Sequence, residues 1–195
     1  MDLKGKKVIL ASNSPRRREL LKGLDIDFEI DTHNNFEESF SDDTPHPEVP
    51  SLMSRGKSHG FHRPLLDDEI LITSDTMVLL DKIILGKPHS REEAVKMLKT
   101  LSGRTHEVIT AVTFRDGAGH EETFTDSTDV SFGILSDEQI DYYIDRYKPF
   151  DKAGSYGVQE WIGYVAIEGI RGSFYNVMGF PVHKVYECLN RFVNY

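Results

Sequence analysis

The first apolar positions of the chain predict a strand, a tight turn and a helix. Residues 8–11 form a short apolar run that starts with two β-branched side chains, which is typical of a buried strand. Ser14 can then cap a helix whose first position is Pro15. Residues 26–30 alternate between apolar and acidic side chains, which is the period of a half-exposed strand.

A proline-rich acidic segment interrupts this pattern and predicts a long loop over residues 31–50. Residues 51–61 then predict a short helix. Residues 69–80 are apolar on both sides of a polar centre at 73–76. This pattern predicts either one buried strand with a polar centre or two strand pieces with a bend.

Capping signals indicate two further helices. Ser90 and Glu93 have the spacing of a capping box, and so do Ser136 and Gln139. We expect the first of these helices to run to about Leu101, where a Ser-Gly pair ends it.

The remaining apolar positions predict strands and a final helix. Residues 108–114 and 123–132 predict two paired strands joined by a turn, and residues 164–170 predict another strand. Between 182 and 193 the apolar residues recur at helical spacing, which predicts an amphipathic helix. The fold class is therefore α/β, with one twisted mixed sheet flanked by helices in a single domain over residues 1–195.

Composition narrows the class of protein. The 195 residues are 38% hydrophobic and 28% charged, which excludes a disordered tail, a collagen-like fibre and a disulfide scaffold. The single cysteine, Cys188, cannot form an internal disulfide and lies on the apolar pattern of the last helix. No apolar run reaches the roughly 18–20 residues of a membrane span, and the N-terminal run is too short for a signal peptide. We expect a cytoplasmic protein that contacts no membrane.

The charge of −9 argues against broad nucleic-acid binding, but the charges are unevenly placed. Residues 1–24 hold seven Lys and Arg against two acids, whereas residues 25–48 hold nine acids and neither Lys nor Arg. The basic segment could bind an anion and the acidic segment could supply a metal ligand. Two solvated faces would explain the same pattern.

Two places along the chain carry candidate chemistry. The turn at 12–17, with two serines and two arginines at a helix start, has the donors and the positive dipole end that bind phosphate. An ordinary capped helix is the alternative there. Asp75 lies within an apolar strand, where a carboxylate needs a partner, and could bind a divalent ion or act as a general base. The alternative for Asp75 is a cap on the next turn.

Lys57, Lys87 and the adjacent acids Glu37 and Glu38 complete this inventory, although each alone is ambiguous. Cations neutralise phosphate oxygens, a metal polarises the phosphate, and an acid orients water. The residues alone therefore indicate a phosphate-ester or anhydride hydrolase, or a nucleotide-binding protein.

Six segments distributed along nearly the whole chain are Ala11-Ser12-Asn13-Ser14-Pro15-Arg16-Arg17, Ser74-Asp75-Thr76, Leu85-Gly86-Lys87-Pro88, Leu101-Ser102-Gly103-Arg104-Thr105-His106, Asp151-Lys152-Ala153-Gly154-Ser155-Tyr156-Gly157-Val158-Gln159 and Asn176-Val177-Met178-Gly179-Phe180-Pro181. These segments, in this order, resemble those of the Maf family of nucleoside triphosphate pyrophosphatases.

This resemblance implies a fold similar to that of the inosine triphosphate pyrophosphatases, with a cleft between two lobes. It implies hydrolysis of a nucleoside triphosphate to the monophosphate and pyrophosphate with a divalent metal, Mg²⁺ or Mn²⁺. Thr76 and Gln159 match the branch that acts on dTTP and UTP, and modified pyrimidine nucleotides could be further substrates. The family often forms homodimers, so a homodimer is plausible here.

The resemblance also carries residue roles. Asp75 matches the proton acceptor, and it could also contact the metal. Glu38 matches an acidic residue near the metal, with Glu37 beside it. Arg16, Thr76 and Gln159 match positions tied to substrate choice. Ser12, Lys57 and Lys87 match residues that contact the phosphates. The chain departs from the family pattern at Gly56 and Ser74, where alanine is commoner.

Other functions fit parts of this pattern. A nucleotide-binding regulator of cell division would act without turnover, although it would not need an acid at Asp75. A 7-methyl-GTP pyrophosphatase would share the chemistry, but Gln159 argues against it. A structural or adaptor protein would leave Asp75 unexplained.

Overall fold

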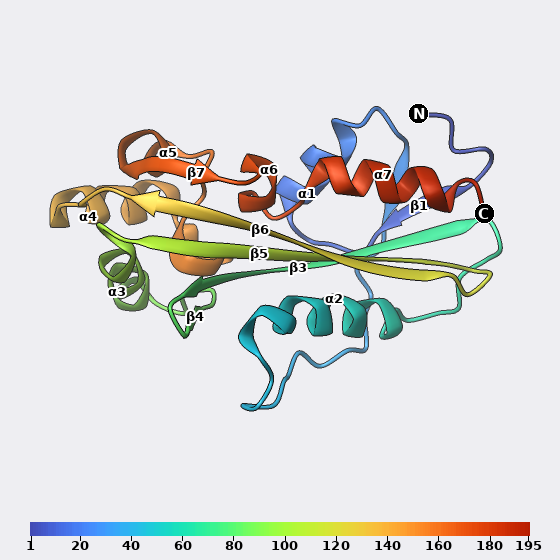
Figure 1. Cartoon of the computed structure of the whole chain (residues 1–195), viewed down its shortest axis with the longest axis horizontal. Helices are drawn as coiled ribbons and strands as arrows, with labels where there is room; N and C mark the ends of the chain where they lie inside the picture. The colour runs from blue at the N-terminus through green and yellow to red at the C-terminus, as the bar shows by residue number, and fades with distance from the viewer. The chain divides into compact units, whose positions relative to one another are not determined.

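The computed structural model describes all residues, 1–195, and has a mixed α/β fold (Figure 1). The strands are β1 (Lys7–Leu10), β2 (Phe28–Ile30), β3 (Glu69–Leu80), β4 (Ile83–Leu85), β5 (Thr105–Asp116), β6 (Glu121–Phe132) and β7 (Ile167–Arg171). The α-helices are α1 (Pro15–Lys22), α2 (Val49–His59), α3 (Arg91–Leu101), α4 (Asp137–Tyr147), α5 (Trp161–Ala166), α6 (Phe174–Val177) and α7 (Val182–Phe192).

The strands form one seven-stranded mixed sheet, which confirms the predicted fold class. Its order is β2-β1-β3-β5-β6-β7, and β4 pairs with β3 off this path. β1 runs parallel to β2 and to β3, whereas β3–β4 and β6–β7 are antiparallel. No helix combines the length and the apolar character that crossing a bilayer requires.

The chain divides into two compact units. The first comprises residues 1–75, 110–126 and 179–195, and the second comprises residues 76–109 and 127–178. Three of the boundaries therefore fall within β3, β5 and β6, and the fourth falls between α6 and α7.

In the first unit, α1 and α7 cover one face of the sheet, and α2 lies on the other (Figure 1). The apolar stripe of α7, which includes Val185, Leu189 and Phe192, packs in one core with Leu21 of α1 and Ile72 of β3. Cys188 belongs to the same core and is buried, as the helical pattern predicts. Burial raises the pKa of its thiol to about 12.

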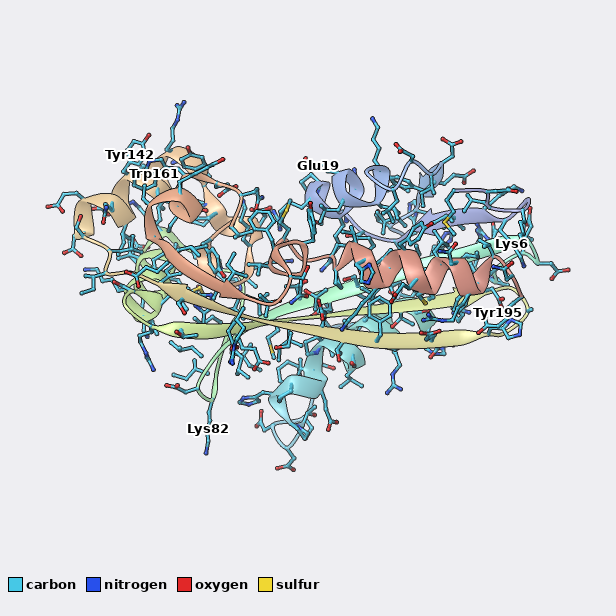
Figure 2. All side chains as sticks on the ribbon, turned by 45° about the horizontal axis from the view of Figure 1, so that its top comes forward. Lys6, Glu19, Lys82, Tyr142, Trp161 and Tyr195 are labelled. Carbon is cyan, nitrogen blue, oxygen red and sulfur yellow. The ribbon has the colours of Figure 1, made fainter.

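In the second unit, α4 is fixed by polar and aromatic contacts. Ser136 and Gln139 form the predicted capping box at its start. The Tyr143 hydroxyl donates a hydrogen bond to Glu160 and accepts one from the Gly157 backbone N–H at 3.0 Å. Tyr142 stacks edge-on against Trp161 of α5, with ring centroids 4.8 Å apart (Figure 2).

Three local predictions need correction or refinement. Residues 69–80 form one continuous strand, so the bend is absent. Ser90 caps α3 by accepting from the Glu93 N–H, but the Glu93 carboxylate accepts from the N–H of His89, so the second half of the capping box is wrong. The predicted loop ends early, because His46–Glu48 forms a 3-10 turn and α2 begins at Val49.

The strand predicted over 164–170 is also wrong in its first half, since α5 extends to Ala166 and β7 starts at Ile167. A tight turn explains the difference: the Gly163 N–H donates to the Glu160 carbonyl at 2.9 Å. A Cβ at Gly163 would lie 1.8 Å from the Val158 carbonyl oxygen, so only glycine fits. This close approach allows residues 164–166, predicted as strand, to belong to α5.

Replacing Gly163 with alanine should lower the free energy of unfolding by about 1–3 kcal/mol, because the backbone of residue 158 must move. Gly169→Ala is the matched control, since a Cβ there meets no atom within 4 Å. Chemical denaturation of both variants checks this. Equal stability of the two variants would show that the turn tolerates a side chain.

Candidate active site

A buried polar contact fixes α2 on the sheet and thereby places Lys57. The Ser54 hydroxyl lies 3.2 Å from the Thr73 carbonyl oxygen and 2.9 Å from the Thr113 hydroxyl. The Thr73 hydroxyl donates in return to the Ser54 carbonyl at 2.8 Å. All three side chains are fully buried, so α2 has one register against β3. Lys57 follows Ser54 by one helical turn and therefore faces the same stretch of β3.

Lys57 joins the two acids that the sequence singled out. Its Nζ lies 2.6 Å from Asp75 Oδ1 and 2.9 Å from Glu38 Oε1. Lys57 and Asp75 are each about one-fifth exposed, whereas Glu38 is 61% exposed. The ammonium group therefore provides the partner that a carboxylate within an apolar strand needs. The geometry also selects Glu38, rather than its neighbour Glu37, as the acid in this ion pair.

These carboxylates are a suitable donor set for a hard divalent cation. Both have an oxygen within 3 Å of the Lys57 nitrogen, so the two carboxylates lie close together beside the ammonium group. Mg²⁺ and Mn²⁺ prefer carboxylate oxygens, and Mg²⁺ is usually held by only one or two of them together with substrate phosphates. Glu38 and Asp75 fit that description.

The turn before α1 is closed by its own side chains. The Ser12 hydroxyl accepts from the Ser14 N–H at 3.2 Å, and Ser14 caps the helix by accepting from the Arg17 N–H. Arg18 donates from Nε and Nη2 to the Ser12 carbonyl at 3.3 and 3.2 Å. Ser12 is buried and Arg16 half-buried, so the predicted phosphate turn is preorganised around Ser12.

Arg17 lies in the predicted phosphate turn, but sequence reasoning assigned it no individual role. Its Nε donates to the Gly179 carbonyl at 2.9 Å, and its Nη1 donates to the Ser74 carbonyl at 2.9 Å and to the Ser12 hydroxyl at 3.4 Å. Desolvation lowers the pKa of its guanidinium to about 10, and the nearby Asp75 carboxylate opposes that shift. Arg17 therefore stays charged at neutral pH and holds the backbone next to Asp75. The sequence contains no signal that distinguishes Arg17 from its neighbours Arg16 and Arg18.

The second unit holds the other predicted site residues. Thr76 follows Asp75 directly in β3 and is half-buried. Lys87 is exposed and follows Gly86, whose carbonyl accepts from the Gly154 N–H at 3.0 Å. This bond joins the Lys87 segment to the segment that ends at Gln159.

Gln159 contains a polar atom that lacks a partner. Its Oε1 is buried and accepts no hydrogen bond. An unpaired buried acceptor costs free energy, about 1–3 kcal/mol, unless a ligand or water satisfies it. Gln159 is therefore suited to accept a hydrogen bond from a bound molecule.

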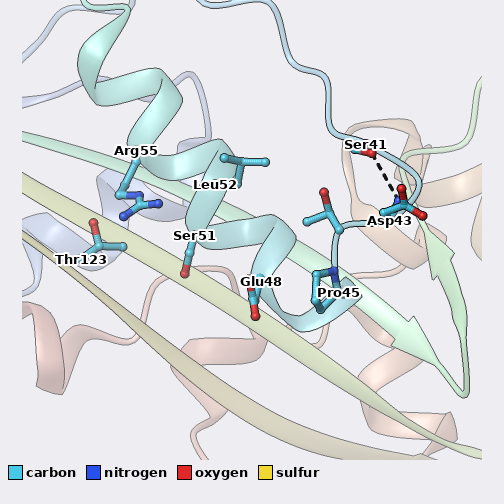
Figure 3. A pocket seen from close by; sticks show the side chains of 9 residues that line it. Ser41, Asp43, Pro45, Glu48, Ser51, Leu52, Arg55 and Thr123 are labelled. Carbon is cyan, nitrogen blue, oxygen red and sulfur yellow. Dashed lines mark hydrogen bonds between the residues drawn. The ribbon is translucent and has the colours of Figure 1, made fainter.

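A separate cavity of about 520 Å³ lies at the start of α2 (Figure 3). Its lining residues come from the acidic segment, from α2 and from β6, and they are Ser41, Asp43, Thr44, Pro45, Glu48, Ser51, Leu52, Arg55 and Thr123. It shares no residue with the predicted site.

Comparisons with known proteins identify the family. Residues 7–192 match the Maf-like protein family, and the chain therefore belongs to it. A dTTP/UTP pyrophosphatase of Porphyromonas gingivalis is 50% identical over 193 residues, covering 98% of this chain and 96% of that protein. A dTTP/UTP pyrophosphatase of Parabacteroides distasonis is 49% identical over 191 residues and 98% of both chains.

Solved structures give a more distant likeness. A HAM1 protein from Coxiella burnetii aligns over 95% of this chain and 99% of that chain, with 14% sequence identity and a TM-score of 0.49.

Replacing Arg17 with lysine should lower the free energy of unfolding by about 1–3 kcal/mol, because one ammonium cannot serve the carbonyls of Ser74 and Gly179 in the same geometry. The matched control is Arg146→Lys, at an exposed arginine of α4. Thermal and urea unfolding measure both changes. A loss in Arg146→Lys as large as that in Arg17→Lys would contradict the role of Arg17.

Proposed function

We propose that this protein hydrolyses dTTP and UTP to the monophosphate and pyrophosphate with Mg²⁺ or Mn²⁺. The observation that carries the chemistry is the convergence of Glu38 and Asp75 on Lys57. The substrate class is supported by relatives of about 50% identity over nearly the whole chain that are named dTTP/UTP pyrophosphatases. Homodimer formation and a cleft between two lobes stay predictions.

Asp75 is proposed as the proton acceptor. Its Oδ1 accepts a hydrogen bond from Lys57 Nζ at 2.6 Å, and the second oxygen, Oδ2, would accept a proton from water. The water oxygen would form a bond to the α-phosphorus while the bond from that phosphorus to the bridging oxygen breaks. Pyrophosphate leaves with that electron pair, and the proton of water passes to Asp75.

Cationic groups would stabilise the charge that the phosphates carry. We assign this role to Lys57, Lys87 and Arg16, with the Ser12 hydroxyl at the start of α1 as a further donor. A divalent cation, when bound by Glu38 and Asp75, would neutralise phosphate oxygens and polarise the phosphate. Arg17 donates to the Ser74 carbonyl next to Asp75 and is proposed as a positioning residue.

The test is pyrophosphate release from dTTP, UTP, CTP, GTP and 7-methyl-GTP with Mg²⁺ or Mn²⁺. We expect release from dTTP and UTP, and a fall in kcat of at least about a hundredfold in Asp75→Asn, because the amide cannot accept the proton. Asp68→Asn is the control, since Asp68 is a half-buried acid just before β3 whose partner is Lys7 at 2.8 Å.

Each other outcome identifies a different function. Pyrophosphate mainly from 7-methyl-GTP would keep the chemistry and contradict the proposed roles of Thr76 and Gln159. Nucleotide binding without any pyrophosphate would favour the regulator that acts without turnover. Full activity of Asp75→Asn would exclude Asp75 as the proton acceptor.

The unpaired Gln159 Oε1 supports a pyrimidine with an N3–H group. Uracil and thymine present this donor between two carbonyl acceptors, whereas cytosine has an acceptor at N3. A glutamine amide can accept from N3–H through Oε1 and donate to the adjacent carbonyl through Nε2. Gln159 and the proposed substrates are therefore complementary, and Thr76 is proposed as the second specificity residue.

Gln159→Leu should reduce the ratio of kcat/KM for UTP to that for CTP by about tenfold or more, because the discriminating hydrogen bonds are lost. Steady-state kinetics with both nucleotides measures this ratio, and thermal unfolding shows that the fold is retained. An unchanged ratio in a folded variant would assign the choice of base to other residues.

A further inference from the structure

The first unit contains a cluster of three side chains that the proposed chemistry does not use. Asp31 follows β2, His33 lies two residues later, and His62 follows the end of α2. His33 Nδ1 lies 2.9 Å from Asp31 Oδ1, and His62 Nε2 lies 2.8 Å from Asp31 Oδ2. One potential ligand atom from each residue lies within 4.8 Å of the other two.

The backbone explains this convergence. Asn34 and Phe61 form an antiparallel bridge, and the Asn35 N–H donates to the Gly60 carbonyl at 2.8 Å. In antiparallel pairing, the positions next to the bridge, 33 and 62, lie opposite each other, and their side chains share a face. Side chains two positions apart in extended backbone point to the same face, so Asp31 lies on the face of His33. The pairing therefore orients both imidazoles toward one carboxylate.

We propose that Asp31, His33 and His62 form a binding site for a divalent transition metal, with Zn²⁺ as the expected ion. Two imidazoles and one carboxylate are a common ligand set for Zn²⁺, and bonds of about 2.0–2.1 Å place tetrahedral ligand atoms roughly 3.4 Å apart. The present spacing approaches that geometry, so side-chain rotation can complete it. His33 is exposed, which gives the ion access and leaves a fourth position for water.

The charges around the cluster favour a cation. The His62 hydrogen bond is the main cause that holds the pKa of the Asp31 carboxyl well below its usual range, and His33 adds to it. The nearby Arg63 is paired bidentately with Glu69, at 2.7 and 2.9 Å, and this pairing offsets its charge.

A metal at this cluster would fasten the segment after β2 to the end of α2. The same segment already contacts α2 where the Asn34 side chain donates to the Lys57 carbonyl at 2.6 Å, and it continues to Glu38. This role is independent of the proposed function, because the oxygen ligands of the active site suit Mg²⁺ while imidazole suits Zn²⁺. The two metals would therefore occupy different sites.

The test is isothermal titration of the full chain with Zn²⁺ in the presence of excess Mg²⁺, together with the d–d absorption of added Co²⁺. We expect one Zn²⁺ per chain, and an affinity that falls by about tenfold or more in both His33→Ala and His62→Ala. His59→Ala is the matched control, because His59 is an exposed histidine at the end of α2 paired with Glu121. Its affinity for Zn²⁺ should equal that of the unmodified chain.

Other results would overturn the proposal. They are the absence of Zn²⁺ binding, or binding that both His33→Ala and His62→Ala retain at full affinity. Equal weakening by His59→Ala would indicate nonspecific binding to surface histidines. Pyrophosphate release with Mg²⁺ should stay unchanged in His33→Ala and His62→Ala, so failure of the metal site is distinguishable from failure of the proposed function.

Discussion

The ion pair between Lys57 and Asp75 is the constraint on which the described site depends. An ionised carboxylate in the middle of a strand flanked by buried residues is unfavourable without a compensating charge. Lys57 provides it, and the buried Ser54–Thr73–Thr113 contact fixes the helix from which Lys57 projects. Three residues at the polar centre of β3 therefore each make a specific contact. The Thr73 hydroxyl donates to the Ser54 carbonyl of α2, and the Ser74 carbonyl accepts from Arg17. Asp75 pairs with Lys57.

The sequence predicted most of the fold because most of its elements have local causes. Periodicity defined α7, and the Ser136–Gln139 capping box marked the start of α4. The predictions failed at two places where a different local contact decided the outcome. The approach of Gly163 to the Val158 carbonyl turned the start of the predicted strand 164–170 into α5, and the His89 N–H took the Glu93 carboxylate that the predicted box had assigned to Ser90.

Without the family resemblance, the residue patterns predicted the candidate site only as a set of residue types. Nothing local to Lys57 shows that it meets Asp75, because 18 positions separate them and the pairing depends on how α2 packs. The choice between Glu37 and Glu38 likewise depends on the path of a segment without regular structure. Arg17 could not be separated from Arg16 by sequence, since only the tertiary contacts with Ser74 and Gly179 distinguish it. It links three of the segments that carry the family resemblance.

One backbone hydrogen bond has a consequence for how this protein can change over evolution. Gly154, at a φ of +67°, donates its N–H to the Gly86 carbonyl, and no side-chain functional group takes part. The positive φ favours glycine at 154, but the bond itself makes no demand on the side chains of Lys87 or Gln159. Mutation can therefore vary what these two segments recognise while the connection between them is inherited unchanged.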